Sequence, residues 1–496
     1  MRAANVFALL ASAGIKPRGI SADSRRVGAG DVFVAWPGAA NDGRRYIDSA
    51  LARGALAVLH ESGDGFSLPA ADRPVFAVED LRALAGHLAH EIYGHPSEKL
   101  WLAGVTGTNG KTTTSQWLAR ALETLGVRCG VIGTLGSGFP DALAAGLNTT
   151  PDALDLHRLL AGFIRDGAQA AVMEVSSIGL DQGRVNGARF KTAIFTNLTR
   201  DHIDYHGSME AYGAAKARFF GMPGLDATVI NLDDDFGLDI ARRLAARGVR
   251  TIGYTLAAVR PVLSGVRTLI GENPRASSMG IAFEAVWEGR RETLDVRMAG
   301  AFNISNLLAV IGALLGRGVA LDDALRVAET LTPPPGRMQL VGGEDEPLVI
   351  VDYAHTPDAL AKVLDAARDT ARSRDGRLTC VFGCGGDRDS GKRSQMGEIA
   401  SRLADRVIVT SDNPRNEEPE RIVAGIVAGA GPRAEIVIER AAAIRAAIRE
   451  ARTEDVVVVA GKGHESYQEI HGERFLFSDI DQAGQALAAW REAMNA

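Results

Sequence analysis

One glycine-rich segment constrains this chain more than any other feature of its sequence: Gly104-Val-Thr-Gly-Thr-Asn-Gly-Lys-Thr-Thr113. It follows an apolar run at 101–105 and precedes a helical pattern that extends to Leu125. A glycine-rich turn between a strand and a helix presents backbone N–H groups to an anion, and the dipole of the helix adds to the attraction. The sequence therefore predicts an α/β fold in which this turn binds phosphate.

The turn departs from the strict phosphate-loop pattern because Val105, and not a glycine, lies five residues before Gly110. We expect Gly104 and Gly107 to serve as the additional turn formers. Lys111 would reach the outer phosphates of a nucleotide, and the hydroxyl group of the threonine after it would coordinate Mg²⁺. The alternative is a simple strand-to-helix turn with a solvated lysine. A phosphate loop alone does not distinguish a motor, a kinase, a GTPase and a ligase.

The length of the chain indicates several domains. At about 150 residues per domain, 496 residues predict three domains, which we place at 1–97, 98–333 and 334–496. The first boundary follows the break Tyr93-Gly-His-Pro96, and the second lies in Pro333-Pro-Pro335, which cannot continue a helix and forms a stiff, extended linker.

Strand and helix patterns alternate from residue 100 onward, which indicates a mostly parallel sheet. Residues 267–298 are expected to form a β-meander appended to that sheet, and residues 303–315 a buried core helix. The first domain mixes short strands and helices, and a second α/β set follows the linker. Short apolar runs predict strands at 31–35, 57–59, 101–105, 170–175, 192–197, 228–231, 348–352, 378–382, 406–410, 435–438 and 455–460, with a late hairpin strand at 475–477.

Composition argues against several classes of protein. With 61 acidic and 55 basic residues the net charge is −6, so we expect no binding to nucleic acid. Three cysteines are too few for a disulfide scaffold or a four-thiolate zinc site, and they fit a reducing, cytoplasmic location. The apolar run at 6–11 is short for a signal-peptide core, and polar residues interrupt 298–316, so no membrane insertion is expected.

Polar residues follow two of the expected strands in the second domain. Glu174 begins the segment Glu-Val-Ser-Ser177 at the carboxyl edge of the sheet, where a Mg²⁺ carboxylate belongs. In the segment 196–206 we favour a metal or phosphate role for His202 over a surface role. The pattern around Lys216 is different: apolar residues surround it at helical spacing, and residue chemistry alone indicates a solvated or snorkelling lysine.

Taken together and in this order, these segments resemble the Mur ligase family. The resemblance covers nearly the whole chain, and its further motifs are Asp23-Ser-Arg25, Gly30-Asp-Val-Phe-Val-Ala35, Phe302-Asn-Ile-Ser-Asn306, Pro335-Gly-Arg-Met338, Asp352-Tyr-Ala-His-Thr-Pro357, Gly383-Cys-Gly-Gly-Asp-Arg-Asp389, Asp412-Asn-Pro-Arg415 and Gly461-Lys-Gly-His-Glu465. It implies a small mixed α/β N-terminal domain, a central phosphate-loop domain and a Rossmann-like C-terminal α/β domain.

The resemblance also implies an activity, which is ATP-dependent amide-bond formation in the synthesis of a peptidoglycan precursor. The motifs at both ends of the chain resemble the members that add meso-2,6-diaminopimelate to UDP-N-acetylmuramoyl-L-alanyl-D-glutamate through an acyl phosphate. ATP would be the co-substrate, Mg²⁺ the cofactor, and Lys216 would carry a carbamate derived from CO₂. A monomeric, cytoplasmic enzyme is expected.

Matching positions in these motifs carry the expected roles, group by group. The catalytic residues would be Lys111, Lys216 and His202. The metal would be held by Thr112, Glu174, His202 and the carbamylated Lys216. ATP would contact Gly107, Thr108, Asn109, Gly110, Lys111, Thr112, Thr113, Asn303, Asn306, Arg337 and Asp352. The UDP-muramoyl dipeptide would contact Ala22, Ser24, Asn148, Thr149, Thr150, Ser176, Gln182 and Arg184. Diaminopimelate would contact Arg388, Asp412, Asn413, Pro414, Arg415, Gly461 and Glu465.

Arg415 is the residue expected to select the amino acid. It follows a predicted strand, where ligand-binding turns concentrate, and a guanidinium group can hold a carboxylate with two parallel hydrogen bonds. Diaminopimelate has a second amino-acid head that lysine lacks, and a buried guanidinium left unpaired can discriminate by roughly 10⁴ or more. The alternative is a surface turn with a solvated arginine. The nearby glycines at 383–386 are not a dinucleotide fingerprint, because Arg388 replaces its third glycine.

Two departures and three rival functions remain open. Ile178 lies where many relatives have histidine, and residues 39–41 match only loosely. A folylpolyglutamate synthase shares the architecture, and a lysine-adding relative is a closer rival. The segment 23–35 argues against the first, and Arg415 argues against the second. Release of ADP that depends on an amino acid would separate a ligase from a nucleotide-dependent switch.

Overall fold

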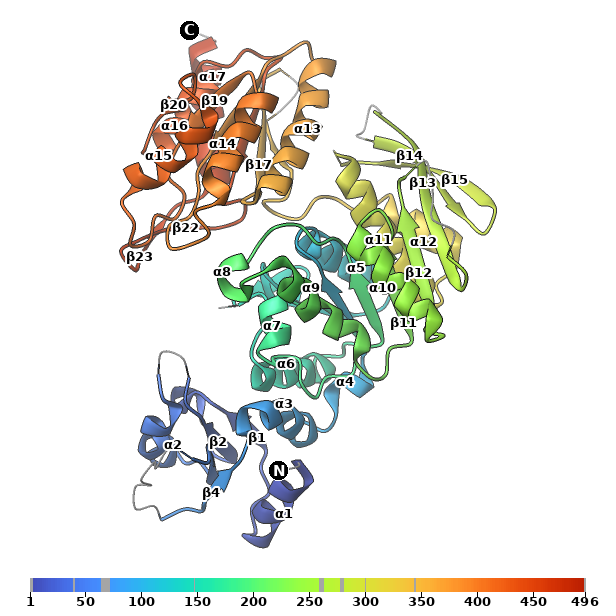
Figure 1. The fold of residues 1–496 in the computed structure, drawn as a ribbon, viewed down its shortest axis with the longest axis vertical. Coiled ribbons are helices and arrows are strands. Elements are labelled where there is room, and N and C mark those ends of the chain that lie inside the picture. Colours follow the sequence, from blue (N-terminus) through green and yellow to red (C-terminus); the bar gives the residue numbers. More distant parts are fainter. Residues whose placement is uncertain are drawn as a thin grey trace.

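The structure is a computed structural model, and it describes residues 3–38, 41–63, 72–146, 148–257, 263–276, 281–298, 300–342 and 345–494. Three α/β units follow one another along the chain, each built on its own sheet (Figure 1). The central unit lies between the other two, which places its loops within reach of both (Figure 1).

The N-terminal unit is a small parallel sheet covered by short helices. Its four strands lie in sequential order: β1 (Gly19–Ser21), β2 (Asp31–Ala35), β3 (Ala57–Glu61) and β4 (Val75–Val78). Its helices are α1 (Ala3–Ser12), α2 (Ile47–Ala52), α3 (Leu81–Ile92) and the 3₁₀ turns η1 (Ser24–Arg26) and η2 (Gly43–Tyr46). The strands expected at 31–35 and 57–59 are confirmed. Ala39 and Ala40, in the loosely matched loop, lie outside the described residues.

The central unit contains a sheet of eleven strands in the order β15-β14-β13-β12-β11-β10-β5-β9-β6-β7-β8. Its seven middle strands, from β13 to β6, run parallel. These strands are β5 (Trp101–Thr106), β6 (Cys129–Gly133), β9 (Ala170–Glu174), β10 (Thr192–Phe195), β11 (Ala227–Asn231), β12 (Thr251–Thr255) and β13 (Val266–Ala276). Two antiparallel additions complete it: β7 (Gly136–Phe139) and β8 (Ala142–Ala144) on one edge, β14 (Ile281–Trp287) and β15 (Arg290–Val296) on the other. The β-meander expected after residue 267 is therefore confirmed.

Helices cover both faces of the central sheet. They are α4 (Pro96–Lys99), α5 (Lys111–Thr124), α6 (Ala153–Arg165), α7 (Ser177–Asp181), α8 (Ile203–His206), α9 (Met209–Ala217), η3 (Arg218–Gly221), α10 (Asp235–Ala246), α11 (Ala301–Arg317) and α12 (Leu321–Ala328). One face packs on α5 and α11 through side chains such as Trp117 and Leu307, and the other packs around Phe190 and Phe219. The apolar helix at 301–317 is buried within the unit. This agrees with the expectation that a stretch interrupted by polar residues is a core helix.

Gly104 corrects one expectation about the turn before α5. It is a residue of β5 and does not form part of the turn. A Cβ atom at this position would collide with the rings of Phe219 and Phe190 on the sheet face. The glycine is needed because aromatic side chains pack directly on the strand.

The C-terminal unit has a six-stranded sheet in the order β16-β17-β21-β18-β19-β20, in which β16 alone is antiparallel. Its strands are β16 (Gln339–Val341), β17 (Leu348–Asp352), β18 (Leu378–Phe382), β19 (Arg406–Val409), β20 (Glu435–Ile436) and β21 (Val456–Ala460). A separate hairpin consists of β22 (Tyr467–Ile470) and β23 (Glu473–Leu476). The helices are α13 (Pro357–Ser373), α14 (Lys392–Leu403), α15 (Pro419–Ala430), α16 (Arg440–Arg449) and α17 (Asp479–Met494).

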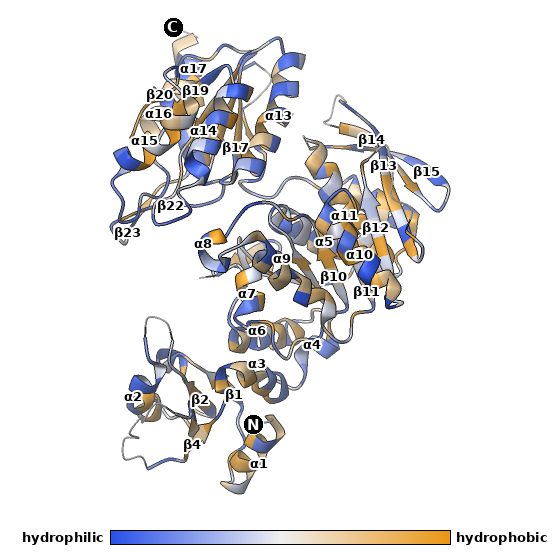
Figure 2. Ribbon diagram, viewed as in Figure 1, coloured by the Kyte–Doolittle hydropathy of each residue, from blue (hydrophilic) through white to orange (hydrophobic). Residues whose placement is uncertain are grey.

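Hydrophobic residues concentrate on the sheets, and helices such as α13 and α14 carry many hydrophilic residues (Figure 2). The three cysteines, Cys129, Cys380 and Cys384, are free and buried, as expected for core residues. Among the described helices, none has the length and apolar character needed to span a bilayer.

Candidate active site

The phosphate loop lies between β5 and α5, as predicted. Gly107 and Gly110 have φ values of 148° and 84°, in the region that favours glycine. A Cβ atom at Gly107 would overlap the hydroxyl group of Thr196, and one at Gly110 would overlap the amide of Asn306. Thr113 is buried in the first turn of α5. The two glycines therefore allow the loop to fit closely between β10 and α11.

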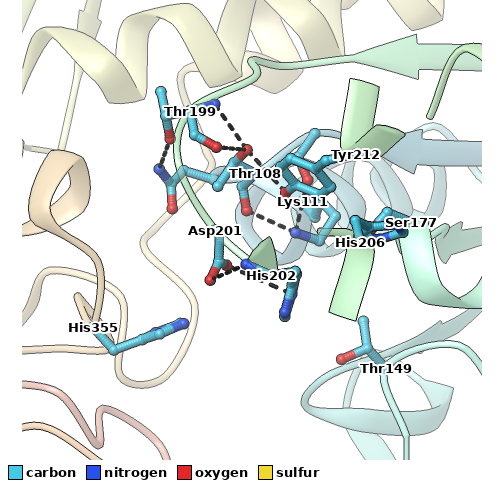
Figure 3. A network of polar contacts seen from close by, with 12 residues as sticks. Thr108, Lys111, Thr149, Ser177, Thr199, Asp201, His202, His206, Tyr212 and His355 are labelled. Carbon is cyan, nitrogen blue, oxygen red and sulfur yellow. Dashed lines mark hydrogen bonds and ion pairs between the residues drawn. The ribbon is translucent and has the colours of Figure 1, made fainter. Parts of the chain in front are cut away.

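Side chains after β10 hold the loop in place. The Asn197 amide accepts a hydrogen bond from the backbone N–H of Asn109 at 2.9 Å and donates to its carbonyl at 3.1 Å. The hydroxyl group of Thr196 donates to the same carbonyl at 2.6 Å. The Thr108 hydroxyl lies 3.0 Å from the hydroxyl group of Tyr212 on α9 (Figure 3). These bonds fix the conformation of the loop between β10 and α9.

Two lysines meet at one carbonyl oxygen of the loop. Lys111 Nζ donates to Gly107 O at 2.9 Å and to Thr108 O at 2.7 Å, and Lys216 Nζ donates to Gly107 O at 2.8 Å. Lys216 is 1% exposed, and its Nζ lies 4.4 Å from the ring centroid of Tyr212. Burial, reinforced by the neighbouring Lys111, holds the pKa of Lys216 well below its usual value. The structure therefore contradicts the solvated lysine that the local pattern suggests, and favours a buried, neutral amine.

Basic side chains of the central and C-terminal units lie near Asp201. Burial alone would raise its pKa, but His202, His355, Lys392 and Lys111 lower the pKa below its usual value. The ring of His355 extends from the C-terminal unit toward Asp201 and His202 (Figure 3). Burial lowers the pKa of His202, whose Nε2 lies 3.5 Å from the Asp201 carboxylate. The Asp201 carboxylate therefore stays ionised, and the lysines that face it are Lys111 and Lys392.

Glu174 is buried at the end of β9 and already has partners. It accepts hydrogen bonds from the backbone N–H of Thr134 at 2.8 Å and from its hydroxyl group at 3.1 Å. In the part of the chain that the structure describes, no group of three His, Cys, Asp or Glu ligand atoms within 4.8 Å of one another includes Glu174 or His202. Thr112 supplies a hydroxyl group and Lys216 an amine, so these four side chains do not form a complete metal site by themselves.

The C-terminal unit reaches the loop through the linker and through α13. Arg337 donates from Nη2 to the hydroxyl group of Thr112 at 3.1 Å and lies over the ring of Tyr353, 4.5 Å from its centroid. The Asn109 amide donates to Asp358 of α13 at 2.9 Å. Arg337 is thus placed beside the phosphate loop, as the sequence motif predicts.

The other residues expected at the nucleotide are buried near this junction. Asn303 and Asn306 lie on α11, with the Asn306 amide donating to Asn303 at 3.3 Å. Asp352 accepts hydrogen bonds from the N–H groups of Met338 and Ala354, both at 2.7 Å. Burial raises its pKa. In this arrangement Asp352 orders the linker, and its role toward a ribose stays a prediction.

Five of the residues expected at the muramoyl substrate form one polar network next to Glu174. The Thr150 hydroxyl lies 3.0 Å from Ser176 Oγ, and the Thr149 hydroxyl lies 3.0 Å from that of Thr134. Arg184 donates to Gln182 at 2.7 Å and to the Thr150 carbonyl at 2.8 Å. Burial lowers the pKa of Arg184.

The remaining members of that set lie apart. Asn148 is exposed, and Ala22 and Ser24 belong to the N-terminal unit. An ion pair of 2.7 Å between Arg26 and Asp155 of α6 connects the turn after Ser24 to the central unit. The structure brings this turn to the side of the central unit, and direct contact with the Thr150 network is not among the bonds observed.

Ile178 carries no polar atom at the start of α7, where a histidine was expected from relatives. The preceding residue, Ser177, hydrogen-bonds instead to the Nε2 atom of His206 at 3.0 Å (Figure 3). A histidine is therefore present on this side of the loop, but it comes from α8.

Residues expected to bind the amino acid form a hydrogen-bonded cluster in the C-terminal unit. Lys462 is fully buried and donates from Nζ to Asn413 Oδ1 at 3.0 Å and to Glu465 Oε2 at 2.9 Å. The Asn413 amide donates to Glu465 at 2.8 Å. A Cβ atom at Gly461 (φ 118°) would lie 2.5 Å from Asp412 Oδ2. The predicted turn is buried at Asp412, Asn413 and Pro414.

Arg415 follows the buried turn of Asp412, Asn413 and Pro414 and is half-buried. It has a positive φ of 53°, and its Nη1 donates to Gly386 O at 2.9 Å. The Glu469 carboxylate lies 3.7 Å from its Nε atom. A Cβ atom at Gly385 would lie 2.8 Å from Arg415 Nη1 and 3.8 Å from Arg388 Cγ. Arg388 itself is exposed and bonds to the backbone, so only Arg415 is held in the turn.

Several residues of the site were not foreseen. Lys462 lies between two glycines of a recognised motif, and Tyr212 looks like a core residue of an amphipathic helix. Asp358 and Glu469 carry no local signal, because their partners are far away in the sequence. Asp201 lies in the segment singled out at 196–206, and its neighbours from the C-terminal unit were not predictable from that segment.

Three family models match the chain in order. The model described as "Mur ligase family, catalytic domain" matches residues 16–93, "Mur ligase middle domain" matches 105–314, and "Mur ligase, glutamate ligase domain" matches 336–463. The segments between these matches contain the two expected boundaries.

Individual proteins are similar over almost the full length. A UDP-N-acetylmuramoyl-L-alanyl-D-glutamate–2,6-diaminopimelate ligase of Pseudomonas aeruginosa is 52% identical over 95% of both chains. The protein of the same name from Ectopseudomonas mendocina is 50% identical over 97% of both chains. A solved structure of a ligase with this name is 37% identical, covers 96% of this chain and 95% of its own, and superposes with a TM-score of 0.67.

Proposed function

This chain belongs to the Mur ligase family, and on that premise we propose that it uses ATP to join meso-2,6-diaminopimelate to UDP-N-acetylmuramoyl-L-alanyl-D-glutamate. The relatives named for this reaction are about half identical over nearly their whole length, which supports the same activity for this chain. The reaction is an acid–amino-acid ligation that yields ADP and phosphate and builds a peptidoglycan precursor. A cytoplasmic monomer is the form we propose.

The observation that carries this proposal is the shared carbonyl of Gly107. Lys111 and Lys216 both donate to it, at 2.9 and 2.8 Å, and two ammonium groups so close would repel each other. Burial lowers the pKa of Lys111 as well, but Glu174 and Asp201 oppose that shift, so we propose that Lys111 is the lysine that stays charged. Lys216 is left as a neutral amine at the end of a phosphate loop, which is the form of lysine that reacts with CO₂.

Carbamylation of Lys216 follows from that protonation state. The neutral amine adds to CO₂, a C–N bond forms, and one proton is released, which leaves a carbamate anion. The Tyr212 ring and the Gly107 carbonyl hold the side chain in place for this step. A carbamate exchanges a group that would repel a metal ion for one with two hard oxygen atoms.

Mg²⁺ fits the donor set that results. The carbamate of Lys216, the carboxylate of Glu174 and the hydroxyl group of Thr112 are oxygen donors of the kind Mg²⁺ prefers, with His202 beside them. When bound, Mg²⁺ supplies charge neutralisation of the ATP phosphates. Thr134 orients Glu174 through two hydrogen bonds, so that carboxylate is fixed before any ligand arrives.

The chain's own residues then reduce the repulsion between two anions. The D-glutamate carboxylate attacks the γ-phosphorus of ATP and displaces ADP, which gives an acyl phosphate. Lys111 and Arg337 are the cations placed at the loop to stabilise the charge that develops. The acyl phosphate is attacked by the amine of diaminopimelate, and phosphate leaves. We propose that Asn303, Asn306 and Asp352 bind the nucleotide, and that the Thr150–Arg184 network with Ala22, Ser24 and Asn148 binds the muramoyl substrate.

The C-terminal pocket would hold the amino acid. A buried lysine, an acid and an amide at Lys462, Glu465 and Asn413 suit the zwitterionic head of diaminopimelate, and Arg415 would clamp its carboxylate. Because the acyl phosphate is destroyed by water, the amine must be close when it forms, and such positioning can provide effective molarities of about 10⁵ M or more. The Arg337–Thr112 and Asn109–Asp358 contacts show the kind of closure that would bring the pocket to the loop.

Phosphate release measured with four mixtures tests the proposal. The enzyme, ATP and Mg²⁺ are incubated with the muramoyl dipeptide and either diaminopimelate, lysine or no amino acid, and with diaminopimelate without the dipeptide. We expect stoichiometric release and a product heavier by one diaminopimelate residue in the first mixture alone. Equal rates with lysine would reject the specificity, and release without any amino acid would favour the switch reading. Sedimentation or light scattering at the mass of one chain tests the monomer.

A further inference from the structure

Histidines gather at a second place, where the N-terminal and central units join. His90 lies in the last turn of α3, His95 is the N-cap residue of α4, and Glu98 lies within α4. Ligand atoms of these three side chains all lie within 4.8 Å of one another, the only such His, Cys, Asp or Glu group among the residues that the structure describes. None of them takes part in the ligase site.

The distances match those around a tetrahedral ion. Two donors that are each about 2.0–2.1 Å from a tetrahedral Zn²⁺ ion lie about 3.3 Å apart. His90 Nε2 lies 3.2 Å from Glu98 Oε1, and His95 Nδ1 lies 3.9 Å from the same oxygen. A small movement of the exposed His95 and Glu98 side chains would therefore bring three donors to one ion.

The orientation of His95 is itself unusual. Its backbone has a positive φ of 58°, a conformation that is costly for a residue other than glycine. Its Nε2 atom lies 3.1 Å from the Glu91 carboxylate, which leaves Nδ1 facing Glu98. Histidines that bind metals typically donate their second ring N–H to a carboxylate in this way, because that bond fixes the tautomer and orients the ring.

The site is open to solvent on one side and buried on the other. The three side chains line a cavity of about 410 Å³, together with His87 and Arg189. His90 is 6% exposed, and its Nδ1 atom is buried with no hydrogen-bond partner among the described residues. The other ring nitrogen, Nε2, is the one that faces Glu98, with which it forms a hydrogen bond of 3.2 Å. Burial lowers the pKa of His90, which keeps the ring neutral as a ligand must be.

We propose that His90, His95 and Glu98 bind a divalent transition-metal ion, for which Zn²⁺ is the best chemical match. Two imidazole nitrogens with one carboxylate form a donor set that suits Zn²⁺, because imidazole is a poor ligand for Mg²⁺, and such three-donor sets leave a fourth position for water. Arg189, whose Nε is 3.8 Å from Glu98, opposes the ion, and Glu91 favours it. The ion would connect the end of α3 to α4, and so fix the joint through which the N-terminal unit is attached.

Zn²⁺ titration of the whole chain, after removal of metals with a chelator, tests this proposal. It is carried out in excess Mg²⁺ with a competing indicator, and is repeated with Co²⁺, whose visible absorption reports four- or five-coordinate imidazole ligation. The variants are His95→Ala and Glu98→Gln, both at exposed positions. His87→Ala is the matched control, because it removes a histidine of the same cavity outside the cluster.

We expect one Zn²⁺ per chain in the wild type and in His87→Ala. Affinity should fall at least about 100-fold in His95→Ala, the loss that even an outer partner of a metal ligand can cause. Zn²⁺ should also raise the melting temperature of the wild type but not of Glu98→Gln. Absence of one-to-one binding in the wild type, or equal affinity in the wild type and His95→Ala, would overturn the proposal. Ligase activity plays no part in these readouts, so they are independent of the proposed function.

Discussion

Replacing Arg415 with alanine should remove most of the preference for diaminopimelate over lysine. Its Nη1 atom is engaged with Gly386 O at 2.9 Å, and a substrate carboxylate would take Nη2 and compete with Glu469 for Nε. Hydrogen bonds to charged groups contribute about 1.5–3 kcal/mol each. The side chain is 20% exposed, so water would compensate in part and we take the lower end for two bonds, about 3 kcal/mol. That corresponds to roughly a 100-fold fall in kcat/KM for diaminopimelate.

The assay is phosphate release at saturating ATP and muramoyl dipeptide, with either amino acid varied. Lysine has no second carboxylate, so its kcat/KM should be unchanged in Arg415→Ala while the KM for ATP also stays constant. Arg415→Lys should be intermediate, because it keeps the charge and loses the fork. Arg421→Ala, an exposed arginine on α15, is the control and should behave as the wild type. An equal fall for both amino acids would refute the clamp and indicate a structural role for Arg415.

Three further changes have defined outcomes. Lys216→Ala should abolish turnover, with partial recovery on addition of short carboxylic acids, and full activity of the variant would remove the carbamate from the mechanism. Wild-type activity at fixed CO₂ should fall as the pH drops through the lowered pKa of Lys216, because a protonated amine cannot add to CO₂. Gly107→Ala should lower ATP affinity, measured by calorimetry, at least about tenfold, since positive-φ strain of about 1–3 kcal/mol adds to contacts of 3.0 and 3.1 Å with the backbone of Asn197. Unchanged affinity would show that the loop can adapt. Arg440→Ala should destabilise the protein by about 3–5 kcal/mol in urea unfolding, because it leaves the fully buried Asp479 unpaired; the double variant Arg440→Met, Asp479→Leu should recover most of that loss, and no recovery would locate the effect elsewhere.

The regular parts of the fold could be predicted because apolar runs and turn signals are local. The strands at 31–35, 348–352 and 378–382 have the expected bounds, and the meander after residue 266 continues the parallel sheet as expected. Other strands were missed. β6 (Cys129–Gly133) is interrupted by glycines, and one of them lies against the Phe163 ring from α6, which only the folded sheet reveals.

The residues of the site could be predicted where they lie within one local motif, and not where segments distant in the sequence come into contact. The positions of the loop glycines and of Lys111 follow from their spacing. Gly104 was wrongly assigned to the turn, because a glycine inside a strand cannot be told from a turn glycine by sequence alone. The burial of Lys216 depends on the Gly107 carbonyl, 109 positions away, and the Arg337–Thr112 bond joins residues 225 positions apart. Such contacts are properties of the tertiary structure, and only the family resemblance anticipated them.

The central claim is that the D-glutamate carboxylate reacts with the γ-phosphate of ATP at the loop that contains Lys111. Transfer of an oxygen isotope from that carboxylate to phosphate tests this claim most directly. The muramoyl dipeptide is prepared with ¹⁸O in its side-chain carboxylate and is incubated with ATP, Mg²⁺ and diaminopimelate. If an acyl phosphate forms, one labelled oxygen bridges carbon and phosphorus and leaves with the phosphate, so the phosphate released should carry one ¹⁸O by mass spectrometry. Unlabelled phosphate from a completed ligation would contradict the account.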